Sequence, residues 1–125
     1  MPKPIVEDGG AVRSDAGKPR YDLIPPEFME ALASHYGAGA GKYADRNWER
    51  GMSWSRCFRP LMSHAWKWFR GETYDDDPSM PGYRAHHMVA VAWNAIALYT
   101  YEVRQMKGDD RPVITPGGSV DAEKP

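Results

Sequence analysis

The sequence is poor in cysteine and in long apolar runs. Its single cysteine, Cys57, excludes a disulfide within the chain and suits a reducing cytoplasm. No apolar run approaches the ~20 residues of a membrane span, and the first residues carry no signal-peptide pattern. A formal net charge of −1 gives no overall basic surface for a nucleic acid. We therefore expect a cytoplasmic protein whose partners include neither a membrane nor a nucleic acid.

Long alternation of apolar and polar residues is also missing, so the sequence predicts no extended β-structure. The 125 residues, 42% of them hydrophobic, suffice for one domain with a real core. We expect an all-α fold: a compact domain of three principal helices around a central apolar helix. Five Trp and seven Tyr exceed what three helices can bury, which predicts that oligomerisation, as a homo-dimer or homo-tetramer, completes the fold.

Composition divides the chain into three segments. Residues 1–17, with Pro2, Pro4 and two adjacent glycines, predict a flexible arm, and residues 108–125 have the composition of a disordered tail. The helical domain is expected over 18–107. Its first stretch, 18–26, is too rich in proline for a helix, and we expect it to lie extended over the body, anchored by Leu23 and Ile24.

The first helix is expected to start at Pro25-Pro26, because proline is accepted in a first helical turn. Three glycines should then weaken or end it: Gly37, Gly39 and Gly41. The second helix is predicted from about Ser53–Ser55 to Phe69, with Pro60 as an irregularity. The third is predicted over about 83–106, and because it is apolar nearly all round it should be the central, most buried helix.

Polar side chains gather between the second and third helices. The 31 residues from His64 to Asn94 contain oxygen and nitrogen donors suited to a divalent cation. The members of this group are His64, Glu72, Asp75, Asp76, Asp77, His86, His87 and Asn94. A structural explanation is open for each, because an acidic turn often caps a helix and an interior histidine is often a core residue. His87 and Asn94 share one stripe of the third helix, so both need partners or line a pocket.

A basic and aromatic segment precedes this group. Seven basic residues fall within 30 positions, which suits a small anionic ligand better than a duplex: Lys42, Arg46, Arg50, Arg56, Arg59, Lys67 and Arg70. In the run GAGAGKYADRNWERG, glycine amides beside Lys42 and Arg46 could cradle a phosphate. The alternative is a helix–helix connection in which Trp48 plugs the core, and the two interpretations are compatible.

Glu27 and Glu30 form an ExxE pair at the start of the first helix. Two acids in a first turn oppose the helix dipole favourably, which explains them structurally. The same spacing also places two carboxylates one turn apart, close enough to share a cation.

Four segments of the sequence resemble the phage dATP/dGTP diphosphohydrolase N-terminal domain family. They are KPRYDLIPPEFMEAL, YGAGAGKYADRNWERG, HAWKWFRGE and HHMVAVAWNAIALYTYE, and the resemblance covers roughly residues 16–104. It implies an all-α enzyme, distantly MazG-like, oligomeric and magnesium-dependent. Such an enzyme hydrolyses a nucleoside triphosphate to the monophosphate and pyrophosphate. If the protein is phage-encoded, it would work in the host cytoplasm.

The resemblance also implies site residues. Its ExxE and ExxD metal motifs match Glu27 with Glu30 and Glu72 with Asp75, as ligands of Mg²⁺ or Mn²⁺. The gap between the two motifs is longer here than in the MazG pattern, and Glu72 follows a glycine. His64 and His87 would orient water or contact a phosphate. The expected nucleotide-binding residues are Lys18, Arg20, Lys42, Tyr43, Arg46, Asn47, Trp48, Trp68 and Asn94.

Two other functions fit the same residues. A non-catalytic sponge that sequesters a nucleotide signalling molecule would use the basic and aromatic side chains without needing the carboxylates. A structural interaction module would use the histidines and Asn94 as polar pairs in the core.

Overall fold

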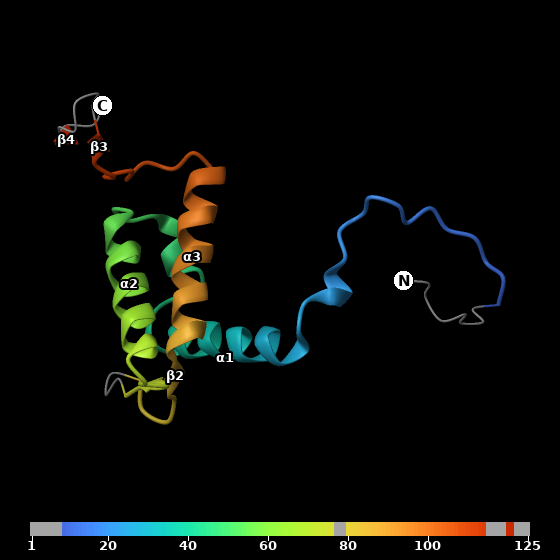
Figure 1. Cartoon of the computed structure of the whole chain (residues 1–125), viewed down its shortest axis with the longest axis horizontal. Coiled ribbons are helices and arrows are strands. Elements are labelled where there is room, and N and C mark those ends of the chain that lie inside the picture. Colours follow the sequence, from blue (N-terminus) through green and yellow to red (C-terminus); the bar gives the residue numbers. More distant parts are fainter. Residues whose placement is uncertain (1–8, 77–79, 115–119, 122–125) are drawn as a thin grey trace.

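The computed structural model describes residues 9–76, 80–114 and 120–121, and it confirms the all-α fold (Figure 1). Helices α2 and α3 lie side by side and antiparallel, and α1 crosses below them with its N-terminal end projecting from the body. The helices are α1 (Pro26–Lys42), α2 (Ser55–Phe69) and α3 (His87–Val103). Short elements complete the chain: 3₁₀ turns η1 (Tyr21–Leu23) and η2 (Asn47–Arg50), and antiparallel pairs β1 (Tyr74–Asp75) with β2 (Ala85–His86) and β3 (Val113–Ile114) with β4 (Val120–Asp121).

Helix α3 is the central helix, as predicted, since it packs against both other helices. Its buried residues are His87, Val89, Ala90, Asn94, Ala97 and Tyr101. Tyr101 is fully buried among Trp54, Cys57 and Ala97, and its hydroxyl donates to the Trp48 carbonyl. Burial, and then the neighbouring Cys57, raise the pKa of Tyr101 to about 12, so the phenol stays a neutral donor.

The sequence predicts that the three glycines weaken or end the first helix, and of these two alternatives the second is wrong. Helix α1 runs through all three of them to Lys42, and Tyr43 closes it by donating to the Gly39 carbonyl. Ring contacts of His35 and Tyr36 with Trp93 hold this half of α1 against α3, so tertiary packing overrides the low helix propensity of glycine. Helix α1 nevertheless has no buried residue along its 17 positions.

Replacing either of two of these glycines by alanine is expected to stabilise the protein. A Cβ built on Gly37 or Gly41 meets nothing within 4 Å, so each Gly→Ala change should raise the free energy of unfolding by about 0.5–1 kcal/mol. Gly71→Ala is the contrasting variant, because Gly71 has φ +104° and alanine is strained there. Urea unfolding of the three variants checks this, and a loss of stability at Gly37 would contradict it.

The ends of α2 and α3 differ in how well the sequence predicts them. Helix α2 keeps its predicted bounds and continues through Pro60. The third helix starts at His87 instead of Tyr83, because Ala85 and His86 pair with β1 and the His86 ring accepts from the Met88 amide as a cap.

Residues just after 107 contact the body. The Trp54 amide donates to the Gly108 carbonyl (2.9 Å), and the Asp110 carboxylate accepts from the Ser55 amide (2.9 Å) and hydroxyl. Asp110 thus caps α2 from 55 positions along the chain, and the Ser55 hydrogen bonds lower the pKa of Asp110. The last tail residues, apart from 120–121, fall outside the described part of the chain, as do residues 1–8 of the arm.

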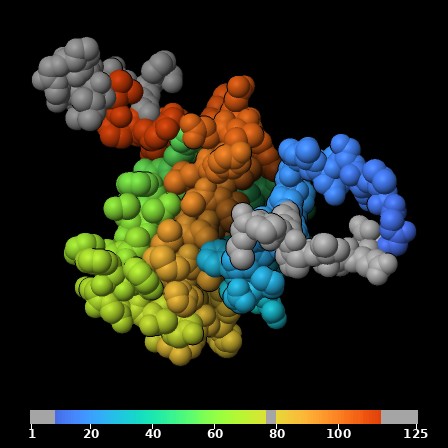
Figure 2. All heavy atoms as spheres, turned by 45° about the vertical axis from the view of Figure 1, so that its right-hand side comes forward, coloured from blue at the N-terminus to red at the C-terminus, as the bar shows by residue number. Residues whose placement is uncertain are grey.

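The expected anchoring of residues 18–26 on the body is not observed. This stretch extends away from the helices (Figures 1 and 2), and Leu23 and Ile24 are 68% and 42% exposed. An ion pair between Arg20 and Asp22 (2.7 Å) fixes the η1 turn locally. Within the described residues, no helix is long and apolar enough to cross a membrane.

Candidate functional site

A cleft opens between the second half of α1, the loop after it, and the first halves of α2 and α3. It consists of two cavities of about 380 and 350 Å³, each within the ~300–1,000 Å³ usual for small-molecule sites. The two cavities share six lining residues: His35, Lys42, Met52, Arg56, Met80 and Trp93. They therefore adjoin, and we treat them as one cleft.

One side of the cleft is basic, as the sequence predicts. Lys42 ends α1, Arg46 follows in the loop, and Arg56 lies in the first turn of α2. Three more predicted residues line the same cavity: Tyr43, Asn47 and Trp48. The glycine amides do not cradle a ligand, however, because residues 37–41 are helical and their backbone serves the helix. Positive charge here thus comes from side chains alone.

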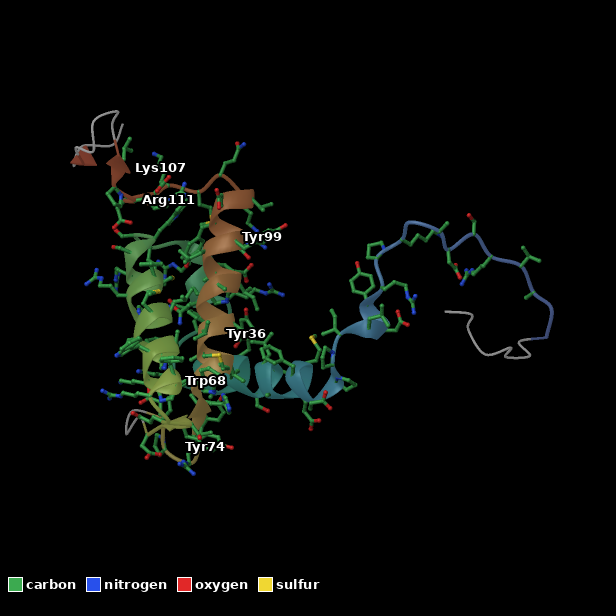
Figure 3. The ribbon with its side chains drawn as sticks, in the orientation of Figure 1. Tyr36, Trp68, Tyr74, Tyr99, Lys107 and Arg111 are labelled. Atoms are coloured by element: carbon green, nitrogen blue, oxygen red, sulfur yellow. The ribbon has the colours of Figure 1, made fainter. Side chains whose placement is uncertain are left out.

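Aromatic rings form a second wall. Trp48 contacts Trp93 edge to face with ring centroids 6.0 Å apart, and Tyr36 lies 6.2–6.3 Å from both (Tyr36 is labelled in Figure 3). The sequence did not indicate Tyr36, Trp93 or His35 as site residues, and it indicated Arg56 only as one of seven clustered basic residues. A signal existed, because the apolar face of α1 continues at helical spacing to His35 and Tyr36 and then into Lys42 and Tyr43.

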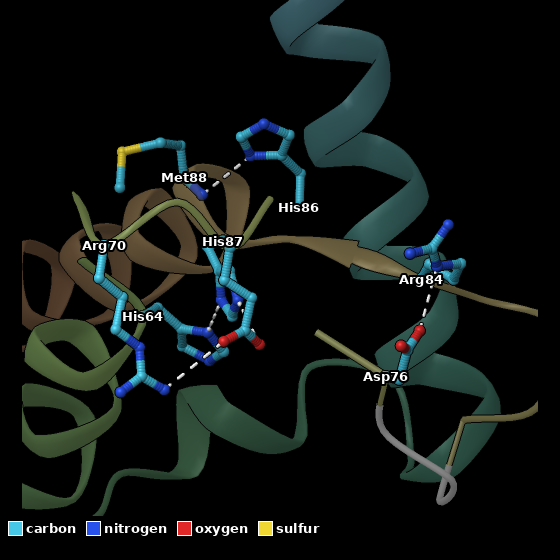
Figure 4. Close-up of polar contacts among 8 residues, drawn as sticks. His64, Arg70, Asp76, Arg84, His86, His87 and Met88 are labelled. Carbon is cyan, nitrogen blue, oxygen red and sulfur yellow. Dashed lines mark hydrogen bonds and ion pairs between the residues drawn. The ribbon is translucent and has the colours of Figure 1, made fainter. Parts of the chain in front are cut away.

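The two predicted histidines contact each other at the edge of the second cavity, which His64 lines and His87 does not. His64 Nδ1 lies 2.8 Å from His87 Nδ1, so one ring donates a hydrogen bond and the other accepts it (Figure 4). His87 is fully buried, and its Nε2 lies 3.3 Å from Glu72 Oε1 without a well-aligned hydrogen bond between them. Glu72 also approaches Arg70 (3.6 Å). The contact occupies Nδ1 of His64, so Nε2 is the ring nitrogen that a ligand or water can contact.

Burial lowers the pKa of two cleft histidines, His64 and His35, and so favours their neutral forms. Loss of hydration lowers the pKa of His64, with the nearby Asp75 opposing this shift. Burial and the charge of His64 lower the pKa of His35, which also hydrogen-bonds the Tyr83 hydroxyl (2.9 Å). A neutral imidazole can accept a proton, so His64 is suited to general-base chemistry near neutral pH.

Asn94 and Asp75 complete this end of the cleft. The buried Asn94 amide donates to the Ala90 carbonyl one turn earlier (2.9 Å), which leaves its carbonyl oxygen as an acceptor. Asp75 lines the same cavity as His64. Of the two explanations predicted for His87 and Asn94, His87 has a partner, His64, while Asn94 both has a partner and lines the cavity.

The four predicted metal-binding carboxylates are not brought together. Glu27 lines a separate groove with Tyr74 and Arg84, Glu30 is exposed on α1, and Glu72 lies behind His87. Only Asp75 of the four lines the cleft. Over residues 9–76, 80–114 and 120–121, no three acidic, histidine or cysteine side chains group so as to hold a metal ion. This donor set does not fit a resident two-motif Mg²⁺ site within one chain.

Three predicted nucleotide contacts lie away from the cleft. Lys18 and Arg20 belong to the projecting arm, and Arg20 pairs with Asp22 instead. Trp68 is 47% exposed near the end of α2 and lines neither cavity of the cleft. Their position in the sequence, near basic or aromatic motifs, gave no information on whether these side chains point into the cleft.

Comparison with known families now adds to this geometry. The chain belongs to the family described as dATP/dGTP diphosphohydrolase, N-terminal, whose model matches residues 8–111. This confirms the family predicted from the sequence motifs. The match spans the second half of the arm, the whole cleft and Asp110, which caps α2. No curated protein and no solved structure matches the chain.

Proposed function

We propose that the protein hydrolyses a purine deoxynucleoside triphosphate, of the dATP or dGTP type, to the monophosphate and pyrophosphate. The observation that carries this is a single cleft that joins three cationic side chains, a wall of aromatic rings and a histidine backed by a buried histidine. The family description supports the substrate and reaction class.

Each part of the cleft matches one part of this substrate. Lys42, Arg46 and Arg56 oppose the charge of the polyphosphate. The rings of Trp48 and Trp93 offer flat surfaces on which a base stacks, which is favourable for any purine.

The reaction needs an activated water. Water attacks the α-phosphorus, its proton goes to Nε2 of His64, and the oxygen that bridges the α- and β-phosphorus leaves with pyrophosphate. His87 holds His64 through the Nδ1 contact, and Glu72 lies against the far side of His87. This chain of contacts orients the imidazole in the way that a third group orients the base in other hydrolases.

Magnesium enters this proposal with the substrate. Because the four carboxylates are dispersed, we propose that Mg²⁺ arrives on the nucleotide phosphates, keeping several of its waters. It would supply neutralisation of the leaving pyrophosphate.

A turnover screen tests the function. Purified protein is incubated with each common nucleoside triphosphate and Mg²⁺, and pyrophosphate and monophosphate are measured. We expect equal amounts of both products, highest with dATP or dGTP, and none after chelation of Mg²⁺. Tight nucleotide binding without pyrophosphate would support the sponge, and neither binding nor turnover would refute the proposal.

Basic residues of the cleft give a sharper prediction. Lys42→Ala and Arg46→Ala should each weaken nucleotide binding about tenfold or more, because a hydrogen bond to a charged group contributes roughly 1.5–3 kcal/mol. Lys42 is exposed, so its replacement should change stability by less than about 0.5 kcal/mol. Arg46 is exposed but pairs with Glu49 (2.8 Å), so Arg46→Ala should cost up to about 1 kcal/mol. Lys107→Ala, which also removes an exposed lysine but lies outside the cleft (Figure 3), is the control. Calorimetry and thermal melting separate the two effects, and equal loss in all three variants would contradict the assignment.

A further inference from the structure

Arg46, one of the three cations of the cleft, has a backbone conformation that arginine rarely adopts. Its φ of 57° and ψ of 23° lie in the left-handed helical region, where the Cβ crowds the following carbonyl oxygen. The Glu49 amide donates to the Arg46 carbonyl (2.9 Å), and this bond holds the turn into η2. Strain of this kind is typical of functional positions.

The side chain of Arg46 is held by the same partner. Its Nη1 donates to Oε2 of Glu49 (2.8 Å), while Oε1 of that carboxylate accepts from Nη1 of Arg104 (2.8 Å). The Glu49 side chain is 15% exposed, so its carboxylate depends on these two guanidinium groups more than on water. The hydrogen bond from Arg104 and then that from Arg46 lower the pKa of Glu49, which keeps the carboxylate charged. We name these three residues the Glu49 trio.

The two arginines of the Glu49 trio lie in different places. Arg46 lines the cleft, and its side chain is 81% exposed, so its guanidinium is open to a ligand. Arg104 is the C-cap of α3 and lines neither cavity of the cleft. Arg104 therefore contacts Glu49 from outside the cleft, whereas Arg46 contacts it from the cleft side.

Glu49 has a fixed position near the cleft because η2 is anchored on α3. The Tyr101 hydroxyl donates to the Trp48 carbonyl, and the rings of these two residues contact each other with centroids 6.1 Å apart. Burial and then the charge of Glu49 raise the pKa of Tyr36, a ring of the aromatic wall, so the carboxylate lies close to that wall. A carboxylate in this place repels an anionic ligand unless a cation compensates it.

The division of the Glu49 oxygens decides how much of Arg46 a ligand can use. A guanidinium and a carboxylate often form a bidentate pair with two parallel hydrogen bonds. Here Arg104 occupies one oxygen, so Arg46 donates one hydrogen bond to Glu49 and keeps the rest of its five N–H donors. Two arginines and one glutamate also leave the trio with a net positive charge. Without Arg104, both oxygens would be open to Arg46, and the remaining pair would have no net charge.

We propose that Arg104 is a positioning residue for nucleotide binding, which prevents Glu49 from neutralising Arg46 and so leaves the charge and donors of Arg46 to the polyphosphate. This role rests on the proposed function for the identity of the anion. The one hydrogen bond between Arg46 and Glu49 also holds the guanidinium at the cleft, so less side-chain freedom is lost when a ligand binds.

A double-mutant cycle between Arg104 and Glu49 tests this role in the full chain. Calorimetry with Mg²⁺ measures the dissociation constants of two probes: inorganic triphosphate, which lacks base and sugar, and the α,β-methylene analogue of dATP, in which carbon replaces the bridging oxygen of the scissile bond. Arg104→Gln should raise both constants about three- to tenfold, because hydrogen bonds to a charged group are lost. In a chain that already carries Glu49→Gln, the same change should alter them less than about twofold, because a neutral amide does not neutralise Arg46.

Two variants separate this effect from the loss of a surface charge. Arg104→Lys retains a cation for Oε1 of Glu49, and the contact uses one nitrogen, so both probes should bind within about twofold of the unaltered protein. Arg111→Gln removes another paired arginine beyond the end of α3 (Figure 3) and should leave binding unchanged, because Arg111 lies outside the cleft. Arg104 is 52% exposed, so its variants should fold, as circular dichroism checks. If Arg104→Gln does not fold, Arg104→Met, which also removes the charge, takes its place.

Several results would overturn the role of Arg104. They are unchanged binding in Arg104→Gln, an equal effect of this change with and without Glu49→Gln, failure of Arg104→Lys to bind, or equal weakening by Arg111→Gln. The two probes separate this role from the proposed function. Binding of triphosphate without binding of the analogue would refute the nucleotide function alone, and the cycle would then be measured on triphosphate. Binding of neither probe by the unaltered protein would refute both.

Discussion

His64→Ala is expected to lower the rate of pyrophosphate release by roughly 10²–10⁴-fold, the usual contribution of a positioned general base. The side chain lies in the cleft, and only its Nδ1 is engaged, by His87. Because burial lowers the pKa of His64 from 6.5, the base form persists below that pH. The rate of the unaltered enzyme should therefore rise with pH through a value under 6.5 and then level.

His86→Ala is the matched control for this variant. His86 is a neighbour of His87 in the sequence but caps α3 and lines the separate groove with Glu27, so its loss should leave turnover within a few-fold. A second variant, His64→Gln, retains a polar side chain beside the buried His87 and should also be inactive. Steady-state rates over pH 5–8 for all three decide the role, and an active His64→Gln enzyme would remove the general base from the mechanism.

Tyr101→Ala should lower the free energy of unfolding by about 3–5 kcal/mol, the range for deleting a buried aromatic ring. Tyr101 is 0% exposed, packs with Trp54 and Cys57, and ties α3 to η2 through the Trp48 carbonyl. Tyr101→Phe should lower it by about 1–3 kcal/mol, because that carbonyl is left without its donor.

Tyr99→Ala provides the same chemical change at an exposed site of the same helix. Tyr99 is 69% exposed and points away from the core (Figure 3), so its removal should change stability by less than about 0.5 kcal/mol. Urea unfolding measures all three variants. Similar losses at positions 99 and 101 would show that Tyr99 is covered in solution.

The sequence predicts the helices well where local signals are strong. The bounds of α2 and the central position of α3 follow from apolar periodicity, which tertiary structure reinforces. The start of α3 is predicted four residues early because pairing of Ala85 with Asp75 is a contact between distant positions. The length of α1 is underestimated for a similar reason, since contacts with Trp93 outweigh the glycines.

The candidate site is predicted in part. The basic residues Lys42 and Arg46, predicted to bind phosphate, do line the cleft. His64 and His87, predicted to face inward from their helices, contact each other. Neighbouring residues do not determine the direction of a side chain at a helix end, so the sequence did not show that Trp68 and Arg20 lie away from the cleft. Glu27 and Asp75 line different cavities, and this depends on how α1 crosses α3, which no local pattern specifies.

The glycines of α1 have a consequence for the motions of the protein. Gly39 lines the cleft, and Gly37 and Gly41 lie within two residues of it in a helix with no buried side chain. Local opening needs little free energy where few apolar contacts must break and where backbone propensity is low. Amide hydrogen exchange should therefore be fast along residues 37–42 and slow around Tyr101, and a bound nucleotide should slow the exchange of 37–42 selectively. The wall of the cleft would then be the part of the fold that a ligand orders, and part of its binding energy would be spent on that ordering.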